Sequence, residues 1–218
     1  MTLKQSENRL HNLIAAPLAS MGFCEVTRLC FIRGDNERSD ILNFGGRKHQ
    51  GVFYFGFCVG LRFGHIAQLL RPTSTDLSMP TVTLPVHFLH EDHAYFEWSF
   101  GEEGLDQMLL DRVMAEVRTY AIPFFERFRT LASIDACLRS SADVDSFVLT
   151  AEQRLCILAA IASVRGANEE ALRMLDEALA QRQDAVPAKQ VLLEELRTQI
   201  VKRVSSGGCP PSEGDEAR

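Results

Sequence analysis

Residues 52–63 alternate between apolar and other side chains for twelve positions, and this pattern constrains the fold more than any other feature. The apolar positions are Phe53, Phe55, Phe57, Val59, Leu61 and Phe63. Apolar side chains at a period of two are typical of a strand with one buried face. The segment therefore predicts a strand with an aromatic face against a core and a second face of different character.

Four further segments have strand character: 24–33, 38–44, 81–88 and 94–100. The residues between the last two, His90–His93, predict a hairpin connection, and Pro85 favours a position at a sheet edge. Gly45–Gly51 predicts a long turn, and 71–80 has the composition of a loop. Five strands with short connections predict an antiparallel sheet.

Helical periodicity accounts for most of the remaining chain. The predicted helices cover residues 3–21, 105–117, 123–131, 131–138, 151–164, 168–182 and 187–203. Pro17 should end or kink the first of these helices, and Thr150 with Gln153 forms a capping box before 151–164. The fold class is therefore α+β: an antiparallel sheet of about five strands with helices on one face, then an α-helical hairpin or three-helix segment. The expected divisions are an α+β domain 1–139, a linker 140–149, a helical segment 150–204 and a disordered tail 205–218.

Charge and cysteine content narrow the classes of partner and compartment. Residues 1–100 carry nine basic and nine acidic side chains, and the net charge of −6 arises from residues 101–218. Neither half is basic, so we expect no nucleic-acid binding. Six scattered cysteines, a polar N-terminus and the lack of a long apolar run predict a cytoplasmic protein with reduced thiols and no membrane segment.

Three motifs could carry chemistry, and each has a simpler interpretation. His87, His90 and His93 with their acidic neighbours could hold a metal, but spacing of three along a strand alternates faces, so a solvated turn is favoured. Gly45–Lys48 lacks the pattern of a phosphate-binding loop, and its two glycines are typical of a turn between strands. Cys58 lacks a recognisable catalytic context, which favours a packing role. We expect no metal, no cofactor and no catalytic residue.

The second face of the sheet is the best candidate for a binding surface. Alternation places on it Tyr54, Arg62, Thr83, His87, Tyr95 and Glu97. Tyrosine and arginine are typical anchors of protein interfaces, which favours another protein as the partner. Two alternatives remain open: an ordinary solvated face, or a small-molecule pocket or enzyme site near Tyr54, Cys58, Arg62 and His87.

Two parts of the chain show a resemblance to known families. The helix ending at Met21–Phe23, the strand ending at Phe31–Arg33, the aromatic strand, the hairpin around Trp98 and the run Tyr120–Phe124 make residues 3–138 similar to the bacterial domain of unknown function 4304. That resemblance implies an α+β fold and no established activity. By analogy with small bacterial families, it allows a toxin-neutralising immunity protein.

The second resemblance lies in residues 155–179, which look like a single tetratricopeptide repeat. Its small residues around Gly166 include Ala159, Ala162, Ala171 and Ala178. One repeat is too few for a solenoid, so the segment is either a helical hairpin packed on the first domain or an independent partner-binding repeat. The chain as a whole is expected to be a non-enzymatic protein-binding module.

Overall fold

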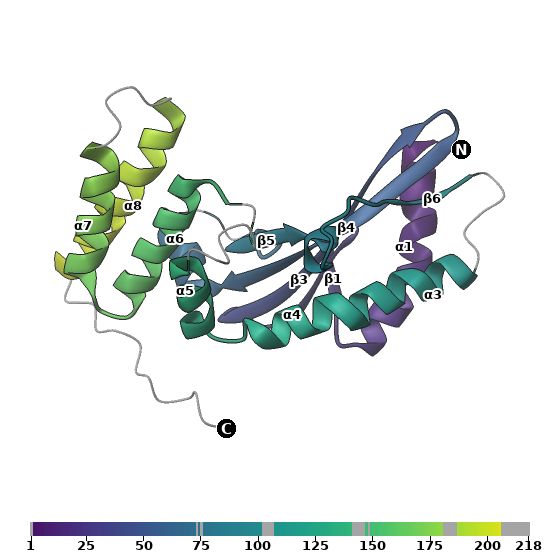
Figure 1. The fold of residues 1–218 in the computed structure, drawn as a ribbon, viewed down its shortest axis with the longest axis horizontal. Coiled ribbons are helices and arrows are strands. Elements are labelled where there is room, and N and C mark those ends of the chain that lie inside the picture. The colour runs from purple at the N-terminus through teal and green to yellow at the C-terminus, as the bar shows by residue number, and fades with distance from the viewer. Residues whose placement is uncertain are drawn as a thin grey trace. The chain divides into compact units, whose positions relative to one another are not determined.

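The computed structural model describes residues 2–72, 74, 76–101, 107–140, 147, 149–180 and 187–205, for 187–190 the backbone only. Within these ranges the protein has the predicted α+β architecture, with one antiparallel sheet and helices (Figure 1). Residue contacts divide the chain into two compact units. The first is Met1–Phe63 with Asp76–Ser133, and the second is Gly64–Thr75 with Ile134–Arg218.

The sheet is built around one long strand pair in the first unit. Its strands are β1 (Cys24–Thr27), β2 (Cys30–Gly34), β3 (Arg38–His49), β4 (Val52–Phe63), β5 (Val82–Pro85) and β6 (Trp98–Phe100). The order is β1-β2-β3-β4-β5, and β6 also pairs with β4. All the pairs are antiparallel, and β3 and β4 stay in register over their full length, from Arg38 opposite Phe63 to His49 opposite Val52.

Two turns differ from the sequence predictions. The single strand predicted at 24–33 is a tight hairpin of β1 and β2, and Leu29 takes a left-handed φ of 60° in its turn. The long turn predicted at Gly45–Gly51 is wrong, because β3 continues to His49. Only Gln50 and Gly51 connect it to β4, with φ of 48° and 83°. Positive φ at both central residues is what a two-residue hairpin turn of type I′ requires.

The hairpin predicted around His90–His93 is also wrong. β5 and β6 do not pair with each other but follow one another along the same edge of β4, where Val82 lies opposite Leu61 and Phe100 opposite Phe53. Both strands are shorter than predicted. Pro85 ends β5 because it has no N–H to donate, and a 3-10 turn, η1 (Val86–Leu89), follows it. The predicted edge position of Pro85 is confirmed.

The helices of the first unit are α1 (Leu3–Ser20), α3 (Gln107–Glu116), the π-helical η2 (Val117–Ala121) and α4 (Ile122–Arg127), followed by the start of α5 (Leu131–Arg139). Thr2 and Gln5 form a capping box at α1, and Pro17 lies in its last turn without ending it. The π-turn joins α3 to α4 directly before Pro123, where the helix was predicted to restart. Residues 102–106, at the predicted start of this helical stretch, lie outside the described residues.

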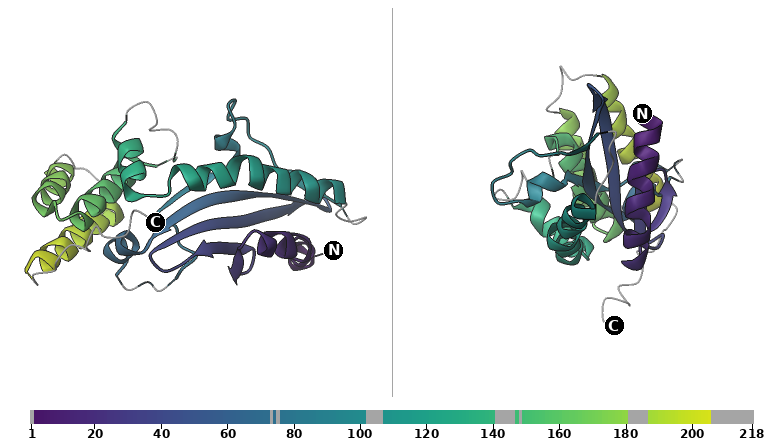
Figure 2. Two further views of the ribbon diagram at one scale, coloured as in Figure 1. Left: turned by 90° about the horizontal axis from the view of Figure 1, so that it is seen from below. Right: turned by 90° about the vertical axis from the view of Figure 1, so that its right-hand side faces the viewer.

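These helices cover one face of the sheet, as predicted, and we call it the closed face. α3 and α4 run along the strands (Figure 2), Phe125 of α4 contacts Phe23, and His11 of α1 stacks on Phe31. The alternating apolar side chains of β4 point to this face and are buried. Phe55 meets Trp98 at a ring separation of 5.7 Å, and this aromatic contact is part of the core.

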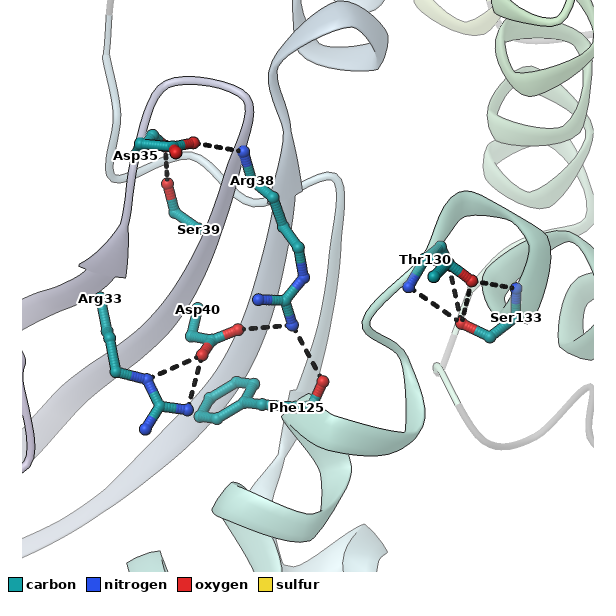
Figure 3. Close-up of polar contacts among 8 residues, drawn as sticks. All are labelled: Arg33, Asp35, Arg38, Ser39, Asp40, Phe125, Thr130 and Ser133. Atoms are coloured by element: carbon teal, nitrogen blue, oxygen red, sulfur yellow. Dashed lines mark hydrogen bonds and ion pairs between the residues drawn. The ribbon is translucent and has the colours of Figure 1, made fainter. Parts of the chain in front are cut away.

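A charged cluster fastens the closed face to α4 (Figure 3). The side chain of Asp40 is 4% exposed and accepts hydrogen bonds from Arg33 Nε (2.9 Å) and Nη2 (2.7 Å). Arg38 Nη2 forms an ion-pair contact with the other carboxylate oxygen at 2.8 Å and donates to the Phe125 carbonyl at 2.9 Å. One buried carboxylate thus links β2, β3 and the backbone of α4.

The second unit is helical. It contains α2 (Gly64–Leu70), α6 (Ala151–Val164), α7 (Asn168–Ala180), α8 (Pro187–Ser205) and most of α5. The residues buried in α6 include Cys156, Ala160 and Val164, since α2, α7 and α8 all contact this helix. The helical segment was predicted to begin at residue 150, whereas the contacts also assign α2 and most of α5 to this unit.

Parts of the predicted linker and tail, residues 141–146, 148 and 206–218, lie outside the described residues. No helix in the described part of the chain combines the length and the apolar character needed to cross a membrane.

Candidate functional site

The face of the sheet opposite the closed face, which we call the open face, carries the side chains that alternate with the core. From β4 these are Tyr54, Gly56, Cys58, Gly60 and Arg62. Their cross-strand partners in β3 are Arg47, Gly45, Asn43, Ile41 and Ser39. The face has two halves of different character, which divide near Cys58.

The inner half of the open face is partly covered by the chain itself. A Cβ atom added to Gly60 would lie 2.9 Å from Pro80 and 3.4 Å from Ile41, so the segment before β5 packs across the strands. Arg62 is only 7% exposed, and its Nη1 donates to the Asn36 carbonyl at 3.0 Å. The prediction that Arg62 belongs to an exposed surface is wrong, because the turn between β2 and β3 and the packed segment enclose this end of the sheet.

Thr83 is exposed, but it lies opposite Gly60 in this inner half. Its hydroxyl donates to the Val59 carbonyl at 3.1 Å. The structure therefore places Thr83 on the predicted face, apart from the remaining candidates.

The outer half of the open face brings the other four predicted residues together around Arg47. We call Arg47, Tyr54, His87, Tyr95 and Glu97 the Tyr54–Tyr95 cluster. Arg47 Nη2 donates to Glu97 Oε2 at 2.8 Å, and its Cζ lies 4.9 Å from the centre of the Tyr54 ring. His87 meets Tyr95 edge to face at a ring separation of 5.1 Å. Tyr95 is 69% exposed, so the cluster presents an aromatic ring to solvent.

The ionisation of this cluster follows from its contacts. Desolvation is the main cause that raises the pKa of Tyr95, and the Glu97 carboxylate adds to it, so the phenol keeps its proton. The hydrogen bond to Glu97 raises the pKa of Arg47, which stays charged. Desolvation, followed by the nearby His90 and His93, lowers the pKa of His87. At neutral pH the cluster thus offers an uncharged imidazole and phenol beside one ion pair.

A second set of contacts holds the loop that carries Tyr95. His90 Nε2 lies 2.7 Å from Glu116 Oε2, and its ring stacks on Tyr120 at 4.0 Å. Phe96 packs on both His90 and Trp98, each at a ring separation of 5.0 Å. The loop between β5 and β6 is therefore anchored to α3 and η2, elements of the first unit far from it in sequence.

Three residues were not predicted as members or supports of this site: Arg47, Glu116 and Tyr120. Arg47 lay in a predicted turn, although continued alternation through Asn43, Gly45 and Arg47 signals a strand. Nothing in the sequence pairs Glu116 or Tyr120 with His90, because that contact depends on how η2 packs.

The histidines do not form a metal centre in the part of the chain that the structure describes. No group of three or more His, Cys, Asp or Glu side chains there could hold a metal ion. His90 is committed to Glu116 and Tyr120, whereas His87 and His93 contact aromatic rings. Burial raises the pKa of Cys58, which favours the thiol over the nucleophilic thiolate.

The alternative pocket around Tyr54, Cys58, Arg62 and His87 is not assembled. Tyr54 and Arg62 are eight residues apart on one strand, which separates them by about 26 Å. Arg62 is enclosed at the inner end, and Tyr54 lies in the outer half beside Arg47.

Comparison of the chain with known protein families, curated proteins and solved structures gives no match. The similarity to domain of unknown function 4304 and the tetratricopeptide-like segment therefore stay predictions.

Proposed function

We propose that this chain is a non-enzymatic protein-binding module, and that the Tyr54–Tyr95 cluster is its recognition surface. The observation that carries the proposal is the exposure of Tyr95 on a loop whose base is fixed by His90, Glu116 and Phe96. Exposed aromatic side chains beside a guanidinium are typical of the residues that dominate protein interfaces.

The anchoring of the loop supports binding for an energetic reason. A partner that binds a mobile loop must offset the entropy lost when the loop becomes ordered. Here the rings of His90, Tyr120 and Phe96 already restrict the loop, so more of the contact energy remains for affinity. Arg47 is similarly held by Glu97 and Tyr54 before any partner arrives.

A toxin-neutralising immunity protein is one member of this class, and a cytoplasmic location suits a chain whose described cysteines are free thiols. Neutralising a toxin by occupying its surface needs a binding patch and no catalytic group, and exposed aromatic side chains are typical of such patches.

The test is crosslinking from the cluster in the native host. A photoreactive phenylalanine analogue replaces Tyr95 in the full-length protein, and a matched protein carries it at Thr83, which is exposed on the inner half of the same face. We expect one partner to be crosslinked from position 95 and not from position 83. Binding of the purified partner should weaken by at least about 30-fold in Tyr95→Ala and in Tyr54→Ala.

An equal crosslinking yield at both positions, or a partner whose affinity is unchanged in Tyr95→Ala and Tyr54→Ala, would contradict the proposal. Recognition would then be sought in the helical unit, where Val201 and Val204 are exposed on α8.

A further inference from the structure

The outer half of β3 has an edge with which no strand of the described residues pairs. β2 accompanies β3 only as far as Asn43, and the Phe44 N–H then donates to the Leu29 carbonyl at 2.9 Å. Beyond that point β3 runs on to His49, and β4 is the one strand of the described residues that pairs with it there. In Figure 1 the β3–β4 pair extends past the short strands on this side.

The backbone of this edge is accessible. Gly45 and Gly46 are both exposed, and glycine has little besides backbone to expose. Successive residues of a strand direct their N–H and C=O groups to opposite sides. Since Phe44 directs its N–H toward β2, Gly46 directs its own N–H and C=O toward the same edge of β3, beyond the point where β2 ends.

A pair of glycines forms a bare floor beside this edge. Gly45 and Gly56 lie opposite each other on the open face, and a Cβ atom added to either would meet nothing within 4 Å. Glycine inside a strand weakens the sheet and often marks a place where another backbone approaches closely. An aromatic side chain on a neighbouring strand can cover such a glycine and restore the lost contact.

We propose that the free edge of β3 binds an extended segment of the partner protein as an additional strand, and that an aromatic side chain of this segment lies over the Gly45–Gly56 floor. The inference rests on the proposed function and names the form of the ligand. We propose the antiparallel orientation for this segment. Its residue opposite Gly45 then occupies a position where the two strands exchange no hydrogen bonds, and side chains approach most closely at such positions.

A second copy of this chain does not fit the same site. Two β3 edges paired with each other would bring the Arg47–Lys48 stretches of both copies together, and like charges across a strand pair are destabilising. The floor adjoins Tyr54 and Arg47, so one partner could contact both the edge and the Tyr54–Tyr95 cluster.

The test uses two capped model peptides, Thr-Val-Trp-Val-Thr and Thr-Val-Ala-Val-Thr, titrated to millimolar concentration into the full-length protein labelled with nitrogen-15. We expect the tryptophan peptide to shift the amide resonance of Gly46 saturably and to slow its hydrogen exchange. The alanine peptide should bind at least 10-fold more weakly, because it leaves the glycine floor uncovered.

Gly45→Val is the decisive variant. Its side chain has room and suits a strand, so the melting temperature should rise by roughly 2 °C while peptide binding and partner binding are lost. Unchanged tryptophan-peptide binding in Gly45→Val, equal binding of the two peptides, or the absence of a saturable Gly46 shift would overturn the inference. If Gly45→Val keeps the crosslinked partner while Tyr95→Ala loses it, the edge inference fails and the proposed function stands.

Discussion

The two halves of the β3–β4 pair use the same strands in opposite ways. The inner half, 38–44 with 57–63, has β2 on one edge and β5 on the other, with side chains packed on both faces. The outer half, 45–49 with 52–56, is buried only on the closed face, and its β3 edge pairs with no described strand. Register is continuous between them, so the difference lies in the side chains of each half and in what packs against them.

This contrast separates stability from recognition within one ribbon. In the inner half a buried charge cluster and the crossing segment at Pro80 restrain both faces. In the outer half the closed face keeps the strands in place, which leaves the open face available to a partner. Substitutions of neighbouring residues should therefore differ in their effects. A change on the closed face should lower stability, and a change on the open face should weaken partner binding.

The largest expected effect distinguishes the two faces at one point of β4. Phe55→Ala should lower the free energy of unfolding by about 3–5 kcal/mol, because it removes a fully buried ring from the aromatic core. Tyr54→Ala, at the preceding residue, should lower the free energy of unfolding by less than about 1 kcal/mol and yet weaken partner binding by at least about 30-fold. Urea denaturation and binding of the crosslinked partner measure the two effects. Similar losses of stability in both variants would break the distinction.

The next effect compares the ion pairs of the two halves. Asp40→Asn should destabilise the protein by about 2–3 kcal/mol, because Arg33 and Arg38 lose their shared buried carboxylate and keep only partial contact with water. The matched change in the outer half, Glu97→Gln, should cost less than about 1 kcal/mol, since Arg47 is largely exposed. Chemical denaturation of both variants measures the difference, and a larger loss for Glu97→Gln would reverse our assignment of the halves.

A smaller effect tests the turn at the end of the outer half. Gln50 has a left-handed φ of 48° and precedes Gly51, the geometry for which asparagine followed by glycine is favoured. Gln50→Asn should therefore raise the free energy of unfolding by about 0.5 kcal/mol, a fraction of the usual cost of left-handed backbone. A decrease in thermal stability would show that the turn is not of this type.

The smallest expected effect concerns pH at the Tyr54–Tyr95 cluster. The pKa of His87 is lowered from its ordinary value of about 6.5 by desolvation and by His90 and His93. Below that pH the unfolded chain binds a proton at His87 that the folded protein does not. The free energy of unfolding is therefore at its full value above that pH and decreases as the pH falls. His87→Asn should flatten this decline between pH 7 and 5 in thermal denaturation, and Thr83→Asn should not. An equal decline in His87→Asn and the native protein would contradict this origin.

The agreement between sequence and structure is closest where one residue pattern reports one local environment. The strand 52–63 and the helix 151–164 match in their bounds because period-two alternation and a capping box are local signals. The predictions for 24–33 and 45–51 failed because several backbone conformations suit the same residues. A leucine in left-handed geometry and two glycines inside a strand both run against local preference.

For the candidate site, alternation correctly placed Tyr54 and Thr83 on the second face of the sheet but could not say what covers it. Arg62 is enclosed by the turn at Asn36, and the segment at Pro80 covers Gly60, both contacts between residues about 20 or more positions apart. Arg47 was missed because a wrong turn prediction hid its strand.

The sequence by itself determined the α+β class, the aromatic core face of β4 and the helical character of the C-terminal part, since periodicity directly records which side of an element is buried. Only the tertiary structure decided that β5 and β6 share one edge, that His90 anchors the loop against Glu116 and Tyr120, and that no strand of the described residues pairs with the outer end of β3 on its second edge. Those features depend on how distant elements pack and pair. The alternation within one strand does not show which strands lie beside it.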